Sequence, residues 1–299
     1  MADGITEIVF IKNGVETPIG DIGKLVAHDG WGMTPLHRLS ERGPFQHGIT
    51  DLGYRLDARV ATFVFNIGED TLYDMYLRRD AILAYFVPGV EYEIKWTVGA
   101  DVKCVKGFYN ADMSMPWGVG EWAAQRFAIS FICNDPAFYN PVPVSVNFQL
   151  GGSADIWEVP FEVPWHVGAS TIDINTVVDY LGTVISYPPL IRITGPIHDP
   201  ILTNYIAGSG VTYKLDFTGV TIAGGDHYDI DCRYGYKTVV NAAGTDKISE
   251  LTTDSDLSEF GIYPEPEAIG GENTIGLTGS AVTASTKVEI TYYNRFTGR

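Results

Sequence analysis

The pattern of hydrophobic and polar positions predicts short β-strands over most of the chain. Polar and apolar residues alternate at the start of residues 55–65, and a period of two is typical of a strand with one buried face. A first short strand is predicted to end at Asn13 and Gly14, a pair that favours a tight hairpin turn. Valine, isoleucine and aromatic residues favour strands elsewhere in the first half. The strands predicted there cover residues 7–11, 55–65, 90–98, 102–109 and 126–133.

One segment of the first half has helical spacing, and a helix is predicted over residues 71–84. Acidic residues precede it, where the helix dipole favours negative charge, and Pro88 with Gly89 ends it. Two adjacent arginines, Arg78 and Arg79, are expected on or beside its exposed face. The positions that follow the helical period are Leu72, Met75, Tyr76, Arg79 and Leu83.

Residues 28–48 are rich in glycine and interrupt this pattern. The segment also contains Trp31, Met33, Pro35 and Pro44, so it is predicted to form a long loop or an extended arm. Loops of this length are uncommon in compact domains unless they bind something. The segment is therefore a candidate for a contact with another molecule.

A domain boundary is predicted near residues 140–143, where prolines cluster, so that one domain covers residues 1–140 and another residues 141–299. The second half shows no good helical pattern. It consists of short candidate strands separated by glycine-containing turns, which is typical of a β-sandwich or jelly roll. The candidate strands are residues 156–163, 191–194, 213–217, 227–233, 237–240, 274–277 and 287–293.

The charge of the chain argues against nucleic-acid binding. Its formal net charge is −17, with only 20 lysines and arginines among 299 residues. Binding to a phosphate backbone requires clustered basic side chains. The favoured interpretation of the acidic balance is solubility. The alternative is that acidic residues line a channel and keep DNA from adhering as it passes.

The three cysteines, Cys104, Cys133 and Cys232, lie far apart in the sequence. Their spacing fits neither a disulfide framework nor a zinc site, so they are predicted to be buried free thiols of a protein that folds in a reducing cytoplasm. No apolar run approaches the roughly 18–20 residues that cross a membrane, so no membrane insertion is expected. The first residues lack the pattern of a signal peptide.

Two acidic clusters are the strongest candidates for chemistry. On a strand, Asp229 and Asp231 would share one face with His227, an arrangement that offers oxygen ligands to a divalent cation. The favoured alternative is a solvent-facing row, with Tyr228, Ile230 and Cys232 packed inward. The second cluster, residues 254–259, is interpreted as a solvated turn. No catalytic residue, cofactor site or metal site is expected, because no catalytic or ligand motif is present.

The chain has six tryptophans, and exposed tryptophan rings can stack on sugars. Trp165 is the candidate glycan contact. The favoured alternative is packing in a core or at a subunit interface, where tryptophan is enriched. This alternative is strongest for Trp96, which lies within a predicted strand.

The order of several motifs resembles the distal tail proteins of long-tailed phages, which form the baseplate hub at the tail tip. The motifs read SYPPLIRITGPIHDPILTN from residue 186, YDIDCRYGYKTV from residue 228, LTTDSDLSEFGIYPEPEAIGGENTIGL from residue 251 and STKVEITYYNRFTG from residue 285. The segment FAISFICNDP from residue 127 resembles the strand that ends the first domain of that family. The matching residues of the second half include Pro189, Ile191, Ile193, Gly195, Pro200, Asn204, Ile230, Asp231, Gly235, Lys237, Val239, Leu257, Asn273, Ile275 and Arg295.

The resemblance implies a mainly β fold and a structural role. The N-terminal β-rich domain with one helix would assemble into a homohexameric ring, and the C-terminal domain would be a galectin-like β-sandwich. The implied partners are the tail tube protein, the tail hub or fibre protein, and receptor-binding or baseplate proteins. DNA would pass through the channel without specific binding. The implied location is the virion tail tip, after synthesis and assembly in the cytoplasm of the host bacterium. Residues 28–48 are a candidate for reaching a neighbouring subunit.

Two other functions remain open. A carbohydrate-binding adhesion module of the tail tip is favoured by the tryptophans and the predicted sandwich. A glycan hydrolase is the least favoured, because no pair of carboxylates stands out from the acidic background.

Overall fold

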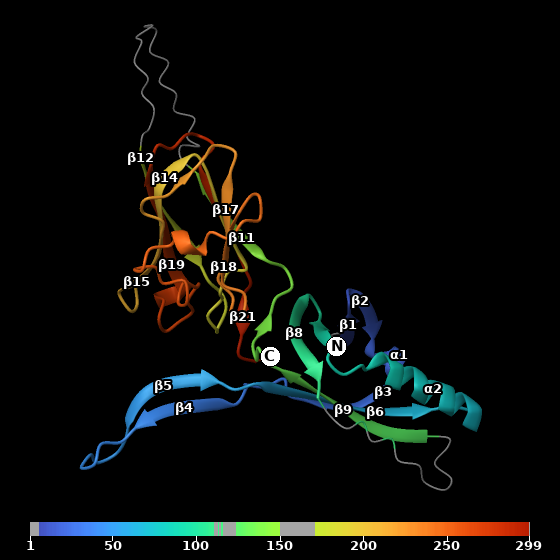
Figure 1. Ribbon diagram of the computed structural model, residues 1–299. Helices are drawn as coiled ribbons and strands as arrows, with labels where there is room; N and C mark the ends of the chain where they lie inside the picture. The colour runs from blue at the N-terminus through green and yellow to red at the C-terminus, as the bar shows by residue number, and fades with distance from the viewer. Residues whose placement is uncertain (1–5, 111–112, 114, 116–123, 150–170, 299) are drawn as a thin grey trace, which may run out of the picture. The chain divides into compact units, whose positions relative to one another are not determined.

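The computed structural model describes residues 6–110, 113, 115, 124–149 and 171–298. The chain divides into two compact units, Met1–Pro141 together with Phe296–Arg299, and Val142–Arg295. The chain therefore enters the second unit once and returns from it to the first. Both units consist mainly of strands, which confirms the predicted fold class (Figure 1).

The first unit is built on one nine-stranded sheet with neighbours in the order β2-β1-β7-β8-β9-β6-β3, while β10 pairs with β8 and β21. The predicted hairpin at Asn13 and Gly14 joins β1 to β2, and both residues have positive φ angles. The strands are β1 (Thr6–Lys12), β2 (Val15–Pro18), β3 (Lys24–Asp29), β6 (Arg59–Gly68), β7 (Glu91–Val98), β8 (Asp101–Tyr109), β9 (Ala124–Cys133), β10 (Phe138–Tyr139) and β21 (Arg295–Phe296).

Alternate residues of these strands bury one face in a common aromatic core. Phe63 and Phe131 come from neighbouring strands, β6 and β9, and both are fully buried. The predicted helix is confirmed as α2 (Leu72–Tyr85), which adds Met75 and Ile82 to this core. Thr71 caps the helix, because its side chain accepts a hydrogen bond from the Asp74 amide. A second, four-residue helix, α1 (Ile19–Ile22), was not predicted.

Of the two forms expected for residues 28–48, the structure has the arm. Strand β4 (Leu36–Glu41) pairs only with β5 (Thr50–Leu56), and the two form a separate two-stranded sheet. Figure 1 shows this hairpin extending beyond the nine-stranded sheet. The hairpin of residues 36–56 is called the arm below.

The second unit is a β-sandwich of two five-stranded sheets. Side chains from both sheets share one hydrophobic core. The first sheet is ordered β11 (Val144–Gln149), β20 (Lys287–Tyr292), β13 (Leu190–Thr194), β17 (His227–Asp231) and β18 (Thr238–Asn241). The second contains β12 (Thr171–Asp179), β19 (Glu272–Ser280), β14 (Ile197–Ile206), β15 (Val211–Asp216) and β16 (Thr221–Ile222). Two short 3-10 helices, η2 (Ile248–Glu250) and η3 (Ile269–Gly271), lie in connections.

Six of the strands predicted for this half match β13, β15, β17, β18, β19 and β20 apart from residues at their ends. Strands β11, β12, β14 and β16 were missed. In β14 the alternation is broken by a bulge between His198 and Ile201, where Asp199 has a positive φ angle. The strand predicted over residues 156–163 lies outside the described residues.

The loop that follows η2 covers the outer edge of β15. The Lys214 amide donates to Asp256 Oδ2 over 3.0 Å, and the Lys214 carbonyl accepts from the Asp256 amide over 2.7 Å. The Asp216 amide donates to Ser255 Oγ over 2.9 Å, and its carbonyl accepts from the Thr252 amide over 2.9 Å. The loop thus satisfies backbone groups that an open sheet edge would offer to another strand.

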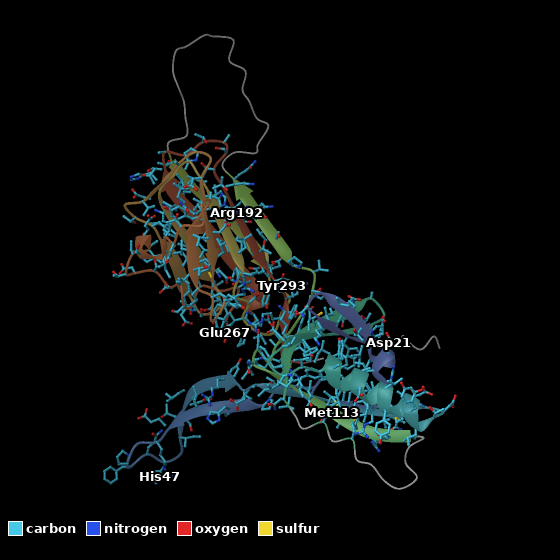
Figure 2. All side chains as sticks on the ribbon, turned by 45° about the vertical axis from the view of Figure 1, so that its right-hand side comes forward. Asp21, His47, Met113, Arg192, Glu267 and Tyr293 are labelled. Carbon is cyan, nitrogen blue, oxygen red and sulfur yellow. The ribbon has the colours of Figure 1, made fainter. Side chains whose placement is uncertain are left out.

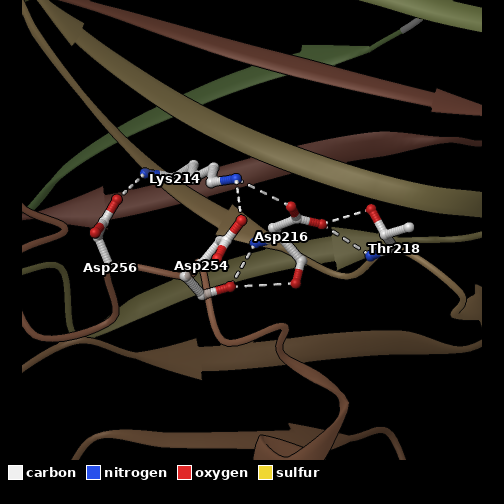
Figure 3. A network of polar contacts seen from close by, with 6 residues as sticks. Lys214, Asp216, Thr218, Asp254 and Asp256 are labelled. Atoms are coloured by element: carbon white, nitrogen blue, oxygen red, sulfur yellow. Dashed lines mark hydrogen bonds and ion pairs between the residues drawn. The ribbon is translucent and has the colours of Figure 1, made fainter.

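Charged side chains reinforce this loop, as Figure 3 shows. Lys214 Nζ lies 3.3 Å from Asp216 Oδ2 and 3.7 Å from Asp254 Oδ2. Thr218 donates to Asp216 Oδ1 from both its amide and its hydroxyl, over 2.9 and 2.7 Å. The solvated turn expected for residues 254–259 is confirmed for Asp254, Ser258 and Glu259, which are exposed, whereas Ser255 and Asp256 bind the edge of β15.

Candidate assembly surface

Both sides of the arm carry exposed apolar side chains. Leu36 lies opposite Leu56, and Arg38 opposite Tyr54, so these side chains project on the same side of the hairpin. The register shifts between Arg38 and Ser40, so β5 has one extra residue there, and the pair of Ser40 with Asp51 follows on that same side. The other side carries His37 with Arg55 and also Leu39, which faces the bulge formed by Leu52 and Gly53.

The apolar side chains of the arm are exposed in the isolated chain. Leu52 is 57% exposed and Tyr54 59%. At the tip Ile49 is exposed and Phe45 reaches 96%; Figure 2 shows the neighbouring His47 at the end of the arm. A two-stranded hairpin is marginally stable in water by itself, and contiguous exposed apolar residues mark an interaction surface. The arm therefore has the character of a segment that docks on a partner.

Local polar contacts shape the arm without covering its apolar side chains. At the tip Gln46 donates from its amide to the Gly43 carbonyl and from its side chain to Thr50 Oγ1. At the base the Asp57 amide donates to the Pro35 carbonyl over 2.9 Å. These contacts hold the hairpin turn and the hairpin base, so the arm is a preformed element.

Helix α2 carries a second exposed apolar surface in the same unit. Its inward side supplies Met75 and Ile82 to the core. Its outward side has large apolar side chains that are about half exposed or more, and contiguous exposed apolar residues mark an interaction surface. The exposed residues are Leu72, Tyr73, Tyr76, Leu77 and Leu83.

The two arginines of the helix have different surroundings. Arg79 donates to Gln125 Oε1 over 3.2 Å and to the Met115 carbonyl over 3.1 Å, so it links the helix to β9. Arg78 donates to the Asp21 carbonyl in α1. Both therefore fasten the helix to its own unit.

The arm and the helix differ in the sign of their charge. The arm contains three arginines and two carboxylates, which makes it basic in a chain of net charge −17. Residues 69–85 contain four carboxylates and two arginines. Figures 1 and 2 show the arm and α2 at opposite ends of the first unit. Two apolar surfaces of opposite charge therefore occur on one unit, too far apart to cover each other.

The acidic cluster of β17 is a row of ion pairs. Asp229 accepts two hydrogen bonds of 2.7 Å from Arg192, which fork across its carboxylate. Asp231 pairs with Arg233 over 2.6 Å. The favoured interpretation is confirmed, because Tyr228 and Ile230 face inward. No group of residues able to hold a metal ion occurs in the part of the chain that the structure describes.

Two tryptophans lie in the first unit's core region. Trp31 is buried, and its ring centroid is 4.3 Å from that of Trp96. Core packing is therefore confirmed for both. Trp165, the candidate glycan contact, lies outside the described residues.

The cysteines are free and buried, as predicted. Burial raises the pKa of each thiol, Cys104, Cys133 and Cys232, to about 12. A thiol with such a pKa holds its proton at neutral pH and is a poor nucleophile. None of them is a candidate catalytic group.

Sequence reasoning missed the two strands of the arm and their exposed apolar side chains. Leu52, Tyr54 and Leu56 alternate with other residues, but glycines and prolines before and between the two strands point to a loop. The outward apolar side of α2 was also missed, because the helix is apolar on both sides and gives no clear polar stripe.

Comparison with solved structures gives the fold a precedent. The chain is similar to the Dit protein of phage SPP1, described as a paradigm of the hub adsorption apparatus in phages that infect Gram-positive bacteria, with a TM-score of 0.64. The two are 16% identical, and the match covers 97% of this chain and 99% of that one. A chain of the phage P2 baseplate in its activated conformation with Ca is also similar, with a TM-score of 0.47, 9% identity and coverage of 96% and 98%.

The resemblance to distal tail proteins is thereby confirmed at the level of the fold. No family model matches the sequence. No curated protein matches it either. None of the described helices is long and apolar enough to cross a membrane.

Proposed function

We propose that this protein is a structural component of the tail tip of a long-tailed phage, where it forms a homohexameric ring. The first unit forms the ring, and the second unit is a galectin-like sandwich that serves as an attachment module. The ring joins the tail tube protein to the tail hub or fibre protein and to receptor-binding or baseplate proteins. The role is architectural and not enzymatic.

The observation that carries this proposal is the pair of exposed apolar surfaces on the first unit. The arm is basic and α2 with its preceding turn is acidic, so the arm of one copy complements the helix of the next in both polarity and charge. A contact between two different surfaces is heterologous, and a heterologous contact closes into a ring when its rotation permits. The arm of each copy therefore docks on α2 of its neighbour.

The fold supports the same role. The similar Dit protein of SPP1 belongs to a hub adsorption apparatus, and the likeness covers nearly the whole of both chains. Fold alone does not define function. The exposed arm and helix add an independent reason to expect assembly.

The test is light scattering on the purified protein, followed by negative-stain imaging of the main peak. At about 100 µM, an interface of ordinary size and micromolar affinity is largely occupied. The expected result is a six-fold ring with an open centre. A monomer throughout that concentration range, or a closed dimer, would contradict the proposal.

The carbohydrate-binding alternative depends on Trp165 and stays a prediction. Its test is a glycan array with the natural protein and with Trp165→Ala. Binding that the substitution abolishes would favour an adhesion module. The acidic channel also stays a prediction, since it depends on which residues face the opening of the ring.

A further inference from the structure

Arg59 is the largest fully buried side chain of the chain as described, and it lies directly after the arm at the start of β6. It donates hydrogen bonds to four backbone carbonyls. Nε donates to Pro136 over 2.8 Å, Nη1 to Gly32 over 2.7 Å and also to Gly30, and Nη2 to Thr297 over 2.6 Å. None of these partners is a carboxylate, so peptide dipoles stabilise the charge in place of an ion pair.

These carbonyls belong to three segments that are distant in sequence. Gly30 and Gly32 lie in the stretch that leads into the arm, which is called the arm root below (residues 30–35). Pro136 follows β9, and Thr297 follows the second unit. The guanidinium also lies 4.3 Å from the ring centroid of Phe138, which covers one of its faces. Arg59 thus ties the arm root to Thr297, which lies 238 residues after Arg59 in the sequence.

The segment of residues 296–298 contacts the arm root in other ways as well. The Thr297 carbonyl also accepts a hydrogen bond from the Thr34 amide, over 3.4 Å. Gly298 lies so close to the root that a Cβ added there would meet the Gly32 carbonyl carbon at 2.9 Å. Phe296 packs against the core of the first unit, with Lys103 Nζ 4.1 Å from its ring centroid.

The geometry requires arginine. A planar guanidinium with donors on three nitrogens reaches carbonyls on three sides, whereas the single ammonium group of lysine cannot span them. Burial lowers the pKa of Arg59, yet arginine remains charged in proteins. Loss of residues 296–298 would leave this buried charge with one acceptor fewer and would free the Thr34 amide.

We infer that residues 296–298 act as a latch that fixes the arm root through Arg59. The arm is held in place only when this segment contacts Arg59 and the arm root. The segment follows the second unit in the sequence. A chain interrupted within the second unit therefore has an unanchored arm. The latch itself does not depend on ring formation; only its consequence, that unlatched chains assemble poorly, rests on the proposed function.

The experiment is hydrogen exchange followed by mass spectrometry, on protein diluted until light scattering shows a monomer. Three variants release the latch by different means: deletion of residues 296–299, Arg59→Lys and Gly298→Ala. In each variant, the amide exchange rate of residues 30–56 should increase roughly tenfold or more. Breaking a hydrogen bond to a charged group is expected to remove that much protection from exchange. Exchange in α2 and in the sandwich should stay unchanged.

The matched control is Gly32→Ala. Its added Cβ meets no heavy atom within 4 Å, although Gly32 and Gly298 are in contact. The control should exchange like the natural protein. Equal exchange of Gly298→Ala and Gly32→Ala in residues 30–56 would overturn the latch. So would a uniform increase across the first unit in Arg59→Lys, because Arg59 would then support general stability. A monomeric natural protein with a latched arm would contradict the ring and leave the latch intact.

Discussion

Asn204 donates a hydrogen bond of 3.1 Å from Nδ2 to Asn273 Oδ1 in the interior of the second unit. Both side chains are fully buried. Asn273 also accepts from the Tyr263 amide and donates to the carbonyls of Tyr263 and Gly271. The two asparagines belong to motifs that resemble distal tail proteins. Those motifs therefore specify a buried hydrogen-bond network inside the sandwich.

Asn273→Ala should destabilise the second unit by about 2–4 kcal/mol, because it leaves several buried polar groups without a partner. Urea unfolding followed by fluorescence measures this change. Asn147→Ala, at an exposed position of β11, is the control and should change stability by less than about 0.5 kcal/mol. Equal effects of the two substitutions would show that the buried amide network contributes nothing.

Leu52→Asn combined with Tyr54→Asn should abolish association of the protein and leave its thermal unfolding nearly unchanged. Both side chains are more than half exposed in the single chain, so their replacement costs the monomer less than about 0.5 kcal/mol. Buried in an interface, each contributes about 1–3 kcal/mol. Sedimentation velocity compares the variant with His37→Gln, which changes the arm without removing an apolar side chain. Unchanged association of the double variant would exclude Leu52 and Tyr54 as the contact.

The second unit should lose stability in acid as the carboxylate of Asp216 becomes protonated. Burial by itself raises the pKa of its carboxyl, but hydrogen bonds from Thr218 and Lys214 outweigh burial and hold the pKa below the ordinary value of 3.8. A carboxyl with a lowered folded-state pKa contributes stability above its unfolded pKa and loses it as the pH falls through the folded value. The advantage of the natural protein over Asp216→Asn should therefore shrink between about pH 5 and pH 3.

Urea midpoints measured at each pH test this expectation. Asp173→Asn, at an exposed position of β12, is the control. A difference between the natural protein and Asp216→Asn that stays constant over this range would mean that the carboxylate has no favourable contacts in the folded state.

The three cysteines should resist alkylation in the folded protein. Because burial raises the pKa of Cys104, Cys133 and Cys232 to about 12, thiolate is scarce at pH 8 and reagents cannot reach the sulfur. Iodoacetamide at that pH should label less than about 10% of each before unfolding and all of each in urea. Rapid labelling of any one of them in native buffer would show that its unit opens locally.

Features set by neighbouring residues could be predicted from the sequence. The helix α2 has both a period and a cap, and the hairpin of β1 and β2 has its Asn13-Gly14 turn. Features set by distant contacts could not. Strand β14 is hidden by a bulge, and the capping of β15 by the loop that follows η2 depends on tertiary hydrogen bonds. Arg59 gives no sequence signal at all, because its partners are backbone carbonyls.

The most direct test of the ring is cross-linking between differently tagged copies of the chain. One copy carries Leu52→Cys in the arm and the other Leu77→Cys on the outward side of α2; the buried native cysteines give little background. A short bismaleimide should join the two tags. It should not do so when Asn147→Cys, at an exposed position of β11 in the second unit, replaces Leu52→Cys. Absence of the cross-link in associated protein, or equal cross-linking from Asn147→Cys, would contradict a ring built by the arm on the neighbouring helix.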